Sequence, residues 1–216
     1  MKKIITIAFA IFFSFSSIAI AEMRYGVSAA LTQIDASGTE TEGGETNNGA
    51  ADNIVVIPSI FVEFETGNLS VGLDYIPMDA DVSDKTKKRT DTETSVSGTV
   101  NSTTTSRSQT AQAELTDHIT LYANYNLGSY YVKAGIAQVT LNTTESLATG
   151  SKYGNVDING AVLGLGTQTG NHRFELVYTD YEDISLTSSV TRTDVSTANK
   201  IEADLDTLGL KYSYVF

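Results

Sequence analysis

The chain has 216 residues, a formal net charge of −12 and no cysteine. The lack of cysteine excludes a disulfide scaffold and a thiolate metal site. The acidic balance argues against nucleic acid as a partner, because phosphate binding needs a basic face. Abundant Thr, Val, Tyr and Gly, with only Pro58 and Pro77 as prolines, favour strands over helices.

The N-terminus has the pattern of a secretory signal peptide. Lys2 and Lys3 precede an apolar stretch over 4–20, and Ala19-Ile20-Ala21 matches the small-x-small cleavage pattern. We predict a signal peptide over 1–21 and a mature domain over 22–216. The alternative is an uncleaved anchor, although serines interrupt the apolar stretch. No later segment is apolar for long enough to form a transmembrane helix.

Eight segments of the mature chain alternate between apolar and polar residues, as strands with two different faces do. They cover about 23–34, 54–65, 69–78, 115–126, 130–141, 156–167, 173–179 and 208–216. In the sixth segment Val156 and Ile158 have the opposite parity to Leu163 and Leu165. This change predicts a bulge or glycine kink near Asn159-Gly160.

Short turns and long loops separate these segments alternately. The turns fall at 66–68, 127–129 and 169–171, and the loops at 35–53, 79–114, 142–155 and 182–200. This rhythm predicts an all-β fold, an eight-stranded antiparallel up-and-down transmembrane β-barrel with short periplasmic turns and long external loops. A water-soluble lipocalin-like barrel is the alternative, and it would enclose the apolar faces around a ligand.

Two of the long loops have distinctive compositions. The loop over 35–53 is acidic without a Lys or Arg, fits no EF-hand spacing and is interpreted as solvated. In the loop over 79–114, the residues Thr90 to Val96 alternate like a strand, so a protruding hairpin with its turn near Ser97-Gly98 or near Asn101-Ser102 and a disordered loop are both open. Its cluster of Lys85, Lys87, Lys88 and Arg89 could contact lipopolysaccharide or be solvated.

The last strand carries the clearest family signal. Leu208, Leu210, Tyr212, Tyr214 and Phe216 alternate with Gly209, Lys211 and Ser213. A polar residue, a glycine and spaced aromatics resemble the signal read by the outer-membrane assembly machinery, here Thr207, Gly209, Tyr212, Tyr214 and Phe216.

The mature chain as a whole resembles the small eight-stranded outer-membrane barrels, the superfamily that includes the OmpA-like transmembrane domain, OmpX and OmpW. The resemblance implies a monomer in the outer membrane of a Gram-negative bacterium. Its expected partners are outer-membrane lipids, lipopolysaccharide and, during biogenesis, the barrel assembly machinery. Since the chain has no tryptophan, its interfacial belt must consist of tyrosine and phenylalanine.

The inward parity of the segments collects equal numbers of opposite charges. They are Arg24, Lys133, Arg173 and Lys211, and Glu63, Glu65, Asp74 and Glu175. Charges removed from bulk water must be paired, so a neutral network is expected in the lumen. This network is either a packed polar plug or the gate of a narrow pore.

Catalysis is not predicted. The nearest match to the His-x-Ser pair of the outer-membrane lipid A deacylases is His118-Ile119-Thr120, with threonine in place of serine, and no cofactor or metal site is expected. The sequence therefore predicts a structural or surface-interaction role: membrane support and loop presentation, including adhesion. The alternative is a narrow porin-like channel for small solutes or ions, and a remote one is a lipid-modifying enzyme.

Overall fold

The computed structural model describes residues 22–42, 45–84, 87–97, 101–146, 152–188 and 198–216. The predicted signal peptide over 1–21 lies outside the described residues. Within these ranges the strands are β1 Glu22–Glu42, β2 Glu45–Thr66, β3 Leu69–Ile76, β4 Ala80–Asp81, β5 Lys87–Ser97, β6 Asn101–Ala111, β7 Ala113–Asn126, β8 Tyr131–Thr143, β9 Asn155–Thr169, β10 His172–Tyr181, β11 Ile184–Thr187 and β12 Lys200–Val215. The described residues contain no helix that is long and apolar enough to span a membrane.

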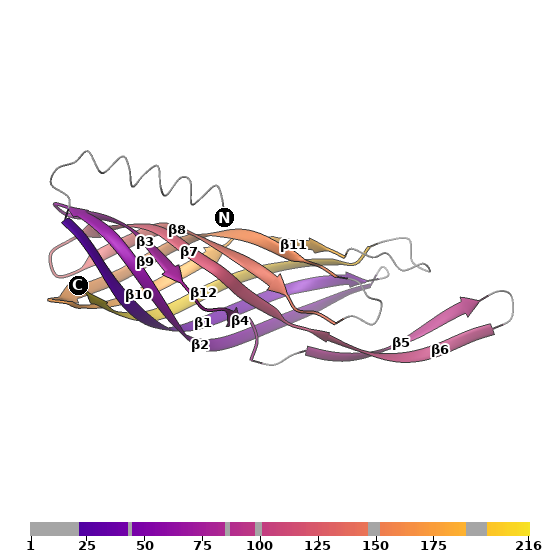
Figure 1. Cartoon of the computed structure of the whole chain (residues 1–216). Coiled ribbons are helices and arrows are strands. Elements are labelled where there is room, and N and C mark those ends of the chain that lie inside the picture. Colours follow the sequence, from indigo (N-terminus) through magenta and orange to yellow (C-terminus); the bar gives the residue numbers. More distant parts are fainter. Residues whose placement is uncertain (1–21, 43–44, 85–86, 98–100, 147–151, 189–197) are drawn as a thin grey trace.

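Eight strands close into an antiparallel barrel in the order β1, β2, β3, β7, β8, β9, β10, β12, and β12 pairs again with β1 (Figure 1). Following partners around the barrel from Val56 leads back to β2 at Thr66, ten residues further along. The strands are thus staggered by ten residues around the ring, which tilts them against the barrel axis. This architecture confirms the predicted fold class.

The outer wall of the barrel is apolar where a membrane would surround it. The row of paired residues that begins at Val56 consists of apolar or aromatic residues until it returns to β2: Val56, Leu31, Leu210, Leu176, Leu165, Val132, Tyr125 and Leu69. All of them are more than a third exposed. Tyrosine and phenylalanine gather at the end that carries the short turns, where Tyr25 stacks on Phe216 with 5.4 Å between ring centroids. We call this end the turn end and the opposite one the loop end.

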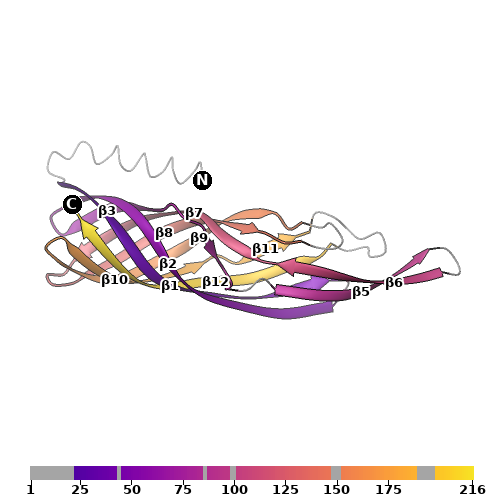
Figure 2. The same cartoon turned by 60° about the horizontal axis from the view of Figure 1, so that its bottom comes forward.

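At the loop end the strands are longer than predicted. β1 and β2 stay paired as far as Glu42 and Glu45, so the predicted loop over 35–53 is wrong: nearly all of it is a two-stranded extension of the wall. The predicted loop over 182–200 contains β11, which pairs with β12. β5 and β6 form a separate hairpin that projects beyond the loop end (Figures 1 and 2), and its last described pair joins Ser97 to Asn101.

Toward the loop end the outer face of the wall becomes polar and the inner face becomes apolar. Four aspartates mark the change on the outer face, where Asp52, Asp35, Asp206 and Asp180 are paired neighbours on β2, β1, β12 and β10. Because this row ends the apolar belt, it lies outside the membrane-spanning segments. Partial burial, and then the charges of Asp35 and Asp180, raise the pKa of Asp206. Beyond the row, Asp157 on the outer face accepts a hydrogen bond of 2.7 Å from the Thr140 hydroxyl, which lowers the pKa of Asp157.

Inside the barrel, the lumen beyond this row is apolar. Its buried side chains are Ile34, Val82, Leu115, Ala137, Val139, Leu141, Ile158, Val162, Tyr181, Ile184, Leu186 and Leu205. The register of β9 with β8 is continuous through Asn159 and Gly160, and its ladder with β10 runs without a shift as far as Gly160, so the predicted bulge there is wrong. Val156 and Ile158 have inward parity because water, not lipid, surrounds this part of the barrel. The irregularity lies in β7, between Thr116 and Ile119, where Asp117 has a φ of 53°.

Candidate functional site

All eight predicted charged residues face the lumen and form four ion pairs. Arg24 lies 2.6 Å from Glu65 near the turn end, and each of their side chains is about a quarter exposed. The other three pairs are Arg173 with Glu63, Lys133 with Glu175, and Lys211 with Asp74, and their six side chains are at most 13% exposed. Six strands contribute to the four pairs, so the network ties the barrel together across its lumen.

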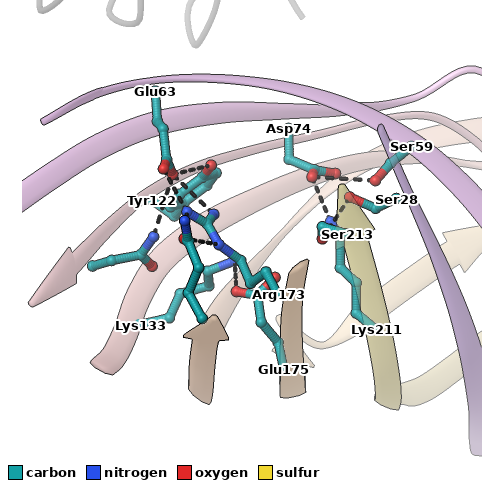
Figure 3. A network of polar contacts seen from close by, with 12 residues as sticks. Ser28, Ser59, Glu63, Asp74, Tyr122, Lys133, Arg173, Glu175, Lys211 and Ser213 are labelled. Carbon is teal, nitrogen blue, oxygen red and sulfur yellow. Dashed lines mark hydrogen bonds and ion pairs between the residues drawn. The ribbon is translucent and has the colours of Figure 1, made fainter. Parts of the chain in front are cut away.

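The three buried pairs and the side chains that contact them are called the plug here. Arg173 lies at its centre (Figure 3). Its two terminal nitrogens donate to the two carboxylate oxygens of Glu63 at 3.0 and 2.5 Å, a bidentate contact that gives a guanidinium and a carboxylate their best geometry. Glu63 also accepts from the Tyr122 hydroxyl at 3.1 Å. Arg173 Nε donates to Gln168 at 3.1 Å, and the guanidinium lies 5.3 Å from the ring centroid of Phe61.

The other two buried pairs extend this plug. Lys133 pairs with Glu175 and lies 4.3 Å from the ring centroid of Tyr122. Lys211 pairs with Asp74, whose carboxylate also accepts from Ser59 at 3.2 Å. Figure 3 shows the Lys211 group beside the Arg173 group. Each buried charge therefore has an opposite charge, which offsets the cost of removing it from water.

Glycines make room for the aromatic rings of the plug. A Cβ at Gly72 would lie 2.4 Å from the Tyr122 ring, and a Cβ at Gly166 would lie 2.3 Å from the Tyr131 ring. Each tyrosine thus lies across the glycine of a neighbouring strand, where no other residue leaves enough space. These rings and the three buried ion pairs fill the middle of the lumen.

A cavity of about 100 Å³ lies on the loop side of the plug. Its polar lining includes Asp74, Lys133 and Lys211, and its apolar lining includes Ile34, Leu115 and Val162. His118 borders it, with Nε2 3.4 Å from the Tyr181 hydroxyl and 3.5 Å from Thr120 Oγ1. The cavity therefore lies between the polar plug and the apolar cluster at the loop end.

The wall of the barrel is interrupted beside this cavity. The ladder between β2 and β3 ends at the pair of Ile60 and Tyr75, which makes it shorter than the other ladders between described strands of the ring. If its register continued, Pro58 would stand opposite Pro77. Proline has no N–H to donate to a ladder, so two facing prolines stop the pairing at this step.

Further along, Asn53 Nδ2 donates to the carbonyl of Asp81 at 2.9 Å and joins β2 to β4. The opening between the Ile60–Tyr75 pair and this bond is called the side window here. Val56 and Ile54, on its edge, are 67% and 65% exposed, the highest values among the large apolar side chains in the described ranges.

A second cavity, of about 260 Å³, lies in the side window. Ile57, Met78 and Ala80 line both this cavity and the one in the lumen. No other described residue belongs to both linings, so these three apolar side chains separate the two cavities, and we call them the partition. Sequence analysis identified neither cavity, although the two prolines were a visible signal for the window.

The predicted assembly residues divide between the two faces of β12. Tyr212, Tyr214 and Phe216 point outward, whereas Thr207 and Gly209 face the lumen cavity. His172 Nδ1 lies 2.7 Å from the Tyr212 hydroxyl, and the Phe216 N–H donates to the Tyr25 carbonyl at 2.8 Å. The last strand therefore closes the barrel against β1 and forms part of the aromatic belt.

Comparison with solved structures places this architecture. The outer membrane protein OprG from Pseudomonas aeruginosa matches with a TM-score of 0.52 and 12% identity, over 91% of this chain and 97% of that one. The outer membrane protein AlkL, solved in lipid bilayers, matches with a TM-score of 0.52 and 14% identity, over 92% of each chain. The chain has the small outer-membrane β-barrel fold. This likeness agrees with the predicted location in a Gram-negative outer membrane. No protein-family model matches the sequence. No curated protein matches it either.

Proposed function

We propose that the barrel admits small apolar molecules from the cell surface and releases them sideways, through the side window, into the outer leaflet of the membrane. This is a modified form of the predicted narrow channel: it does not pass through the membrane, because the buried ion pairs and the rings beside them close the middle of the lumen. The observation that carries the proposal is the partition of Ile57, Met78 and Ala80, shared by the lumen cavity and the window cavity.

The chemistry of the two linings supports this direction of transfer. Beyond the plug the lumen is lined by buried apolar side chains, which favour apolar solutes over ions. The residues at the edge of the window include Val56. Its row in the wall continues through Leu31, Leu210 and Leu176, which are all apolar. A solute leaving through the window would therefore enter hydrocarbon. Met78, an unbranched and flexible side chain, suits a partition that must move aside.

A reversible bridge across the window tests the proposal. Because the chain has no cysteine, Ile57→Cys with Met78→Cys introduces a single disulfide-forming pair. Cells with intact lipopolysaccharide are given N-phenylnaphthylamine, whose fluorescence rises when it enters the membrane. We expect wild-type expression to accelerate the rise, oxidation of the double variant to abolish the gain, and reduction to restore it.

The control bridge is Phe64→Cys with Val71→Cys, a paired position in the closed part of the same ladder. It should leave dye entry at the wild-type rate under both conditions. Dye entry that is insensitive to the upper bridge would contradict the proposal, as would reproducible ion-conductance steps of the wild-type barrel in planar bilayers, since steps require an open plug.

A second role, contact with surface ligands, is favoured by the β5–β6 hairpin. This two-stranded sheet projects beyond the barrel (Figure 2), and neither of its edges is paired with another described strand, although Ser146 bridges the base of β6 at Thr110. Unpaired edges can accept an added strand from a partner. Protease added to intact cells should cut the chain within 85–107, and deletion of 87–111 should reduce adherence without changing dye entry. Unchanged adherence would remove this second role.

A further inference from the structure

Three hydroxyls at the boundary between the plug and the apolar lumen have no assigned role. Thr32, Thr179 and Thr207 line the lumen cavity from β1, β10 and β12. Thr179 on β10 pairs with Thr207 on β12. On its other side Thr207 pairs with Ile34 of β1, which lies two residues after Thr32. The three side chains thus occupy two adjacent rows of the wall, and we call them the hydroxyl collar.

Two of the three collar side chains are buried and Thr207 is half-buried, and the protein does not use their hydroxyls. Thr32 and Thr179 are 8% and 5% exposed. Among the described residues, no side-chain hydrogen bond joins the hydroxyl of Thr32, Thr179 or Thr207 to a partner. Because the three side chains line the cavity, their hydroxyls can both donate to and accept from a ligand that carries a polar group.

The charges around the collar select against an ionic ligand. Lys133, Lys211 and Asp74 also line the cavity, but both lysines are engaged in ion pairs, Lys133 with Glu175 and Lys211 with Asp74. An anion or a cation would have to break one of these pairs. A neutral head that exchanges hydrogen bonds with hydroxyls would not.

The space available matches a head with a chain attached. The lumen cavity, of about 100 Å³, is smaller than the 150 Å³ of an engineered cavity that holds benzene. The window cavity adds about 260 Å³ beyond Ile57, Met78 and Ala80. The window lies beside β2, and of the three collar strands only β1 is paired with β2. A head at the collar therefore leaves its chain free to extend toward the window.

We propose that the preferred solute is an uncharged amphiphile of the straight-chain alcohol type, with its hydroxyl in the collar and its alkyl chain directed through the partition into the side window. This inference rests on the proposed function and names the chemical class that the passage selects. It requires recognition at two separate places, the collar for the head and the partition for the chain.

Methyl signals of the full chain in lipid nanodiscs report on the two places separately. The Met78 ε-methyl reports on the partition and the threonine γ-methyls report on the collar. Hexane, 1-hexanol and hexanoate are titrated at equal concentrations in the bilayer. We expect hexane and hexanol to shift Met78, only hexanol to shift Thr32 and Thr179, and hexanol to bind about fivefold more tightly than hexane for each hydrogen bond gained.

Variants give the decisive comparison. Thr179→Val keeps the shape of the side chain and should weaken hexanol about fivefold while leaving hexane unchanged, which also shows that the variant is folded. Thr169→Val, at the exposed end of β9, is the matched control and should change neither. If Thr179→Val fails to fold, Thr32→Val takes its place.

Three results would overturn the inference. If hexane and hexanol shift the Met78 signal with equal affinity and neither collar variant changes their relative affinity, the collar does not bind the head. The proposed passage through the side window would still hold. If hexanoate binds more tightly than hexanol, the lysines of the plug and not the collar hold the head. If no probe shifts Met78, the proposed function fails as well.

Discussion

The bidentate contact between Arg173 and Glu63 should be the most costly to break in the lumen. Glu63 is fully buried and the Arg173 side chain is 4% exposed. Glu63→Ala removes both carboxylate contacts and leaves the guanidinium without its opposite charge, and breaking a buried pair in this way typically costs about 3 to 5 kcal/mol. We therefore expect a loss of about 4 kcal/mol in the free energy of unfolding, a large part of the stability of an ordinary domain.

A double-mutant cycle separates the pair from its surroundings. Arg173→Ala alone leaves Glu63 with the donors Tyr122 and Asn124 but without a cation. The double variant leaves no unpaired charge, so its loss should be smaller than the sum of the single losses by about 3 kcal/mol. The assay is equilibrium unfolding in urea from lipid vesicles, followed by tyrosine fluorescence and by the shift of the folded band on gels.

The Arg24–Glu65 pair is the internal control. Its side chains are about a quarter exposed near the turn end, so solvent screens the interaction and its loss should cost about 1 kcal/mol or less. Two results would speak against this ranking: additive losses at Glu63 and Arg173, or an exposed pair that is as costly to break as the buried one. Either result would mean that burial does not set the energetics of the plug.

Three further predictions concern the plug, the aspartate row and the last strand. Gly72→Ala should cost about 1 to 3 kcal/mol because its Cβ would lie 2.4 Å from the Tyr122 ring; Gly49→Ala, with open space around it, is the control, and equal unfolding midpoints would refute the clash. Asp206→Asn should stabilise the barrel by about 0.5 kcal/mol at neutral pH, since like charges face each other there. Because the folded pKa of Asp206 is raised, its repulsion is relieved as the pH falls through that pKa, so the gain should vanish below about pH 3; a gain independent of pH would exclude charge as its cause. Deletion of Phe216 should lower the amount of barrel in the outer membrane and leave protein in the periplasm, measured by cell fractionation; normal surface levels would show that the assembly signal does not need it.

Alternation of side chains was sufficient to predict the barrel and its lumen residues. Each of the eight strands that form the ring has a lipid face made of a row of apolar residues, and this indicates which charges point inward. The partners of these charges could not be predicted, because pairing depends on the stagger between strands. Arg173 and Glu175 are neighbours on the inward face of β10, yet they pair with β2 and β8.

The reversal at the loop end was visible in the sequence but was interpreted as a local defect. In β8, β9 and β12 the apolar parity changes between Ile136 and Val139, between Ile158 and Ala161, and between Leu205 and Leu208. One such change predicts a bulge; the same change in several strands indicates that the surroundings change from lipid to water. The predicted loops were too long for this reason, since polar outward residues were taken as the ends of strands.

An inward residue at position 57 should meet lipid through the side window, which would not occur in a sealed barrel. Because the chain has no tryptophan, Ile57→Trp introduces a single fluorophore at the partition, and lipids brominated along their acyl chains quench tryptophans that they contact. Val56→Trp, on the outer face, is the positive control, and Val177→Trp, which lines the lumen cavity behind a paired wall, is the negative control. Quenching at position 57 should be close to that at 56; fluorescence at 57 as protected as that at 177 would show that the wall is sealed there.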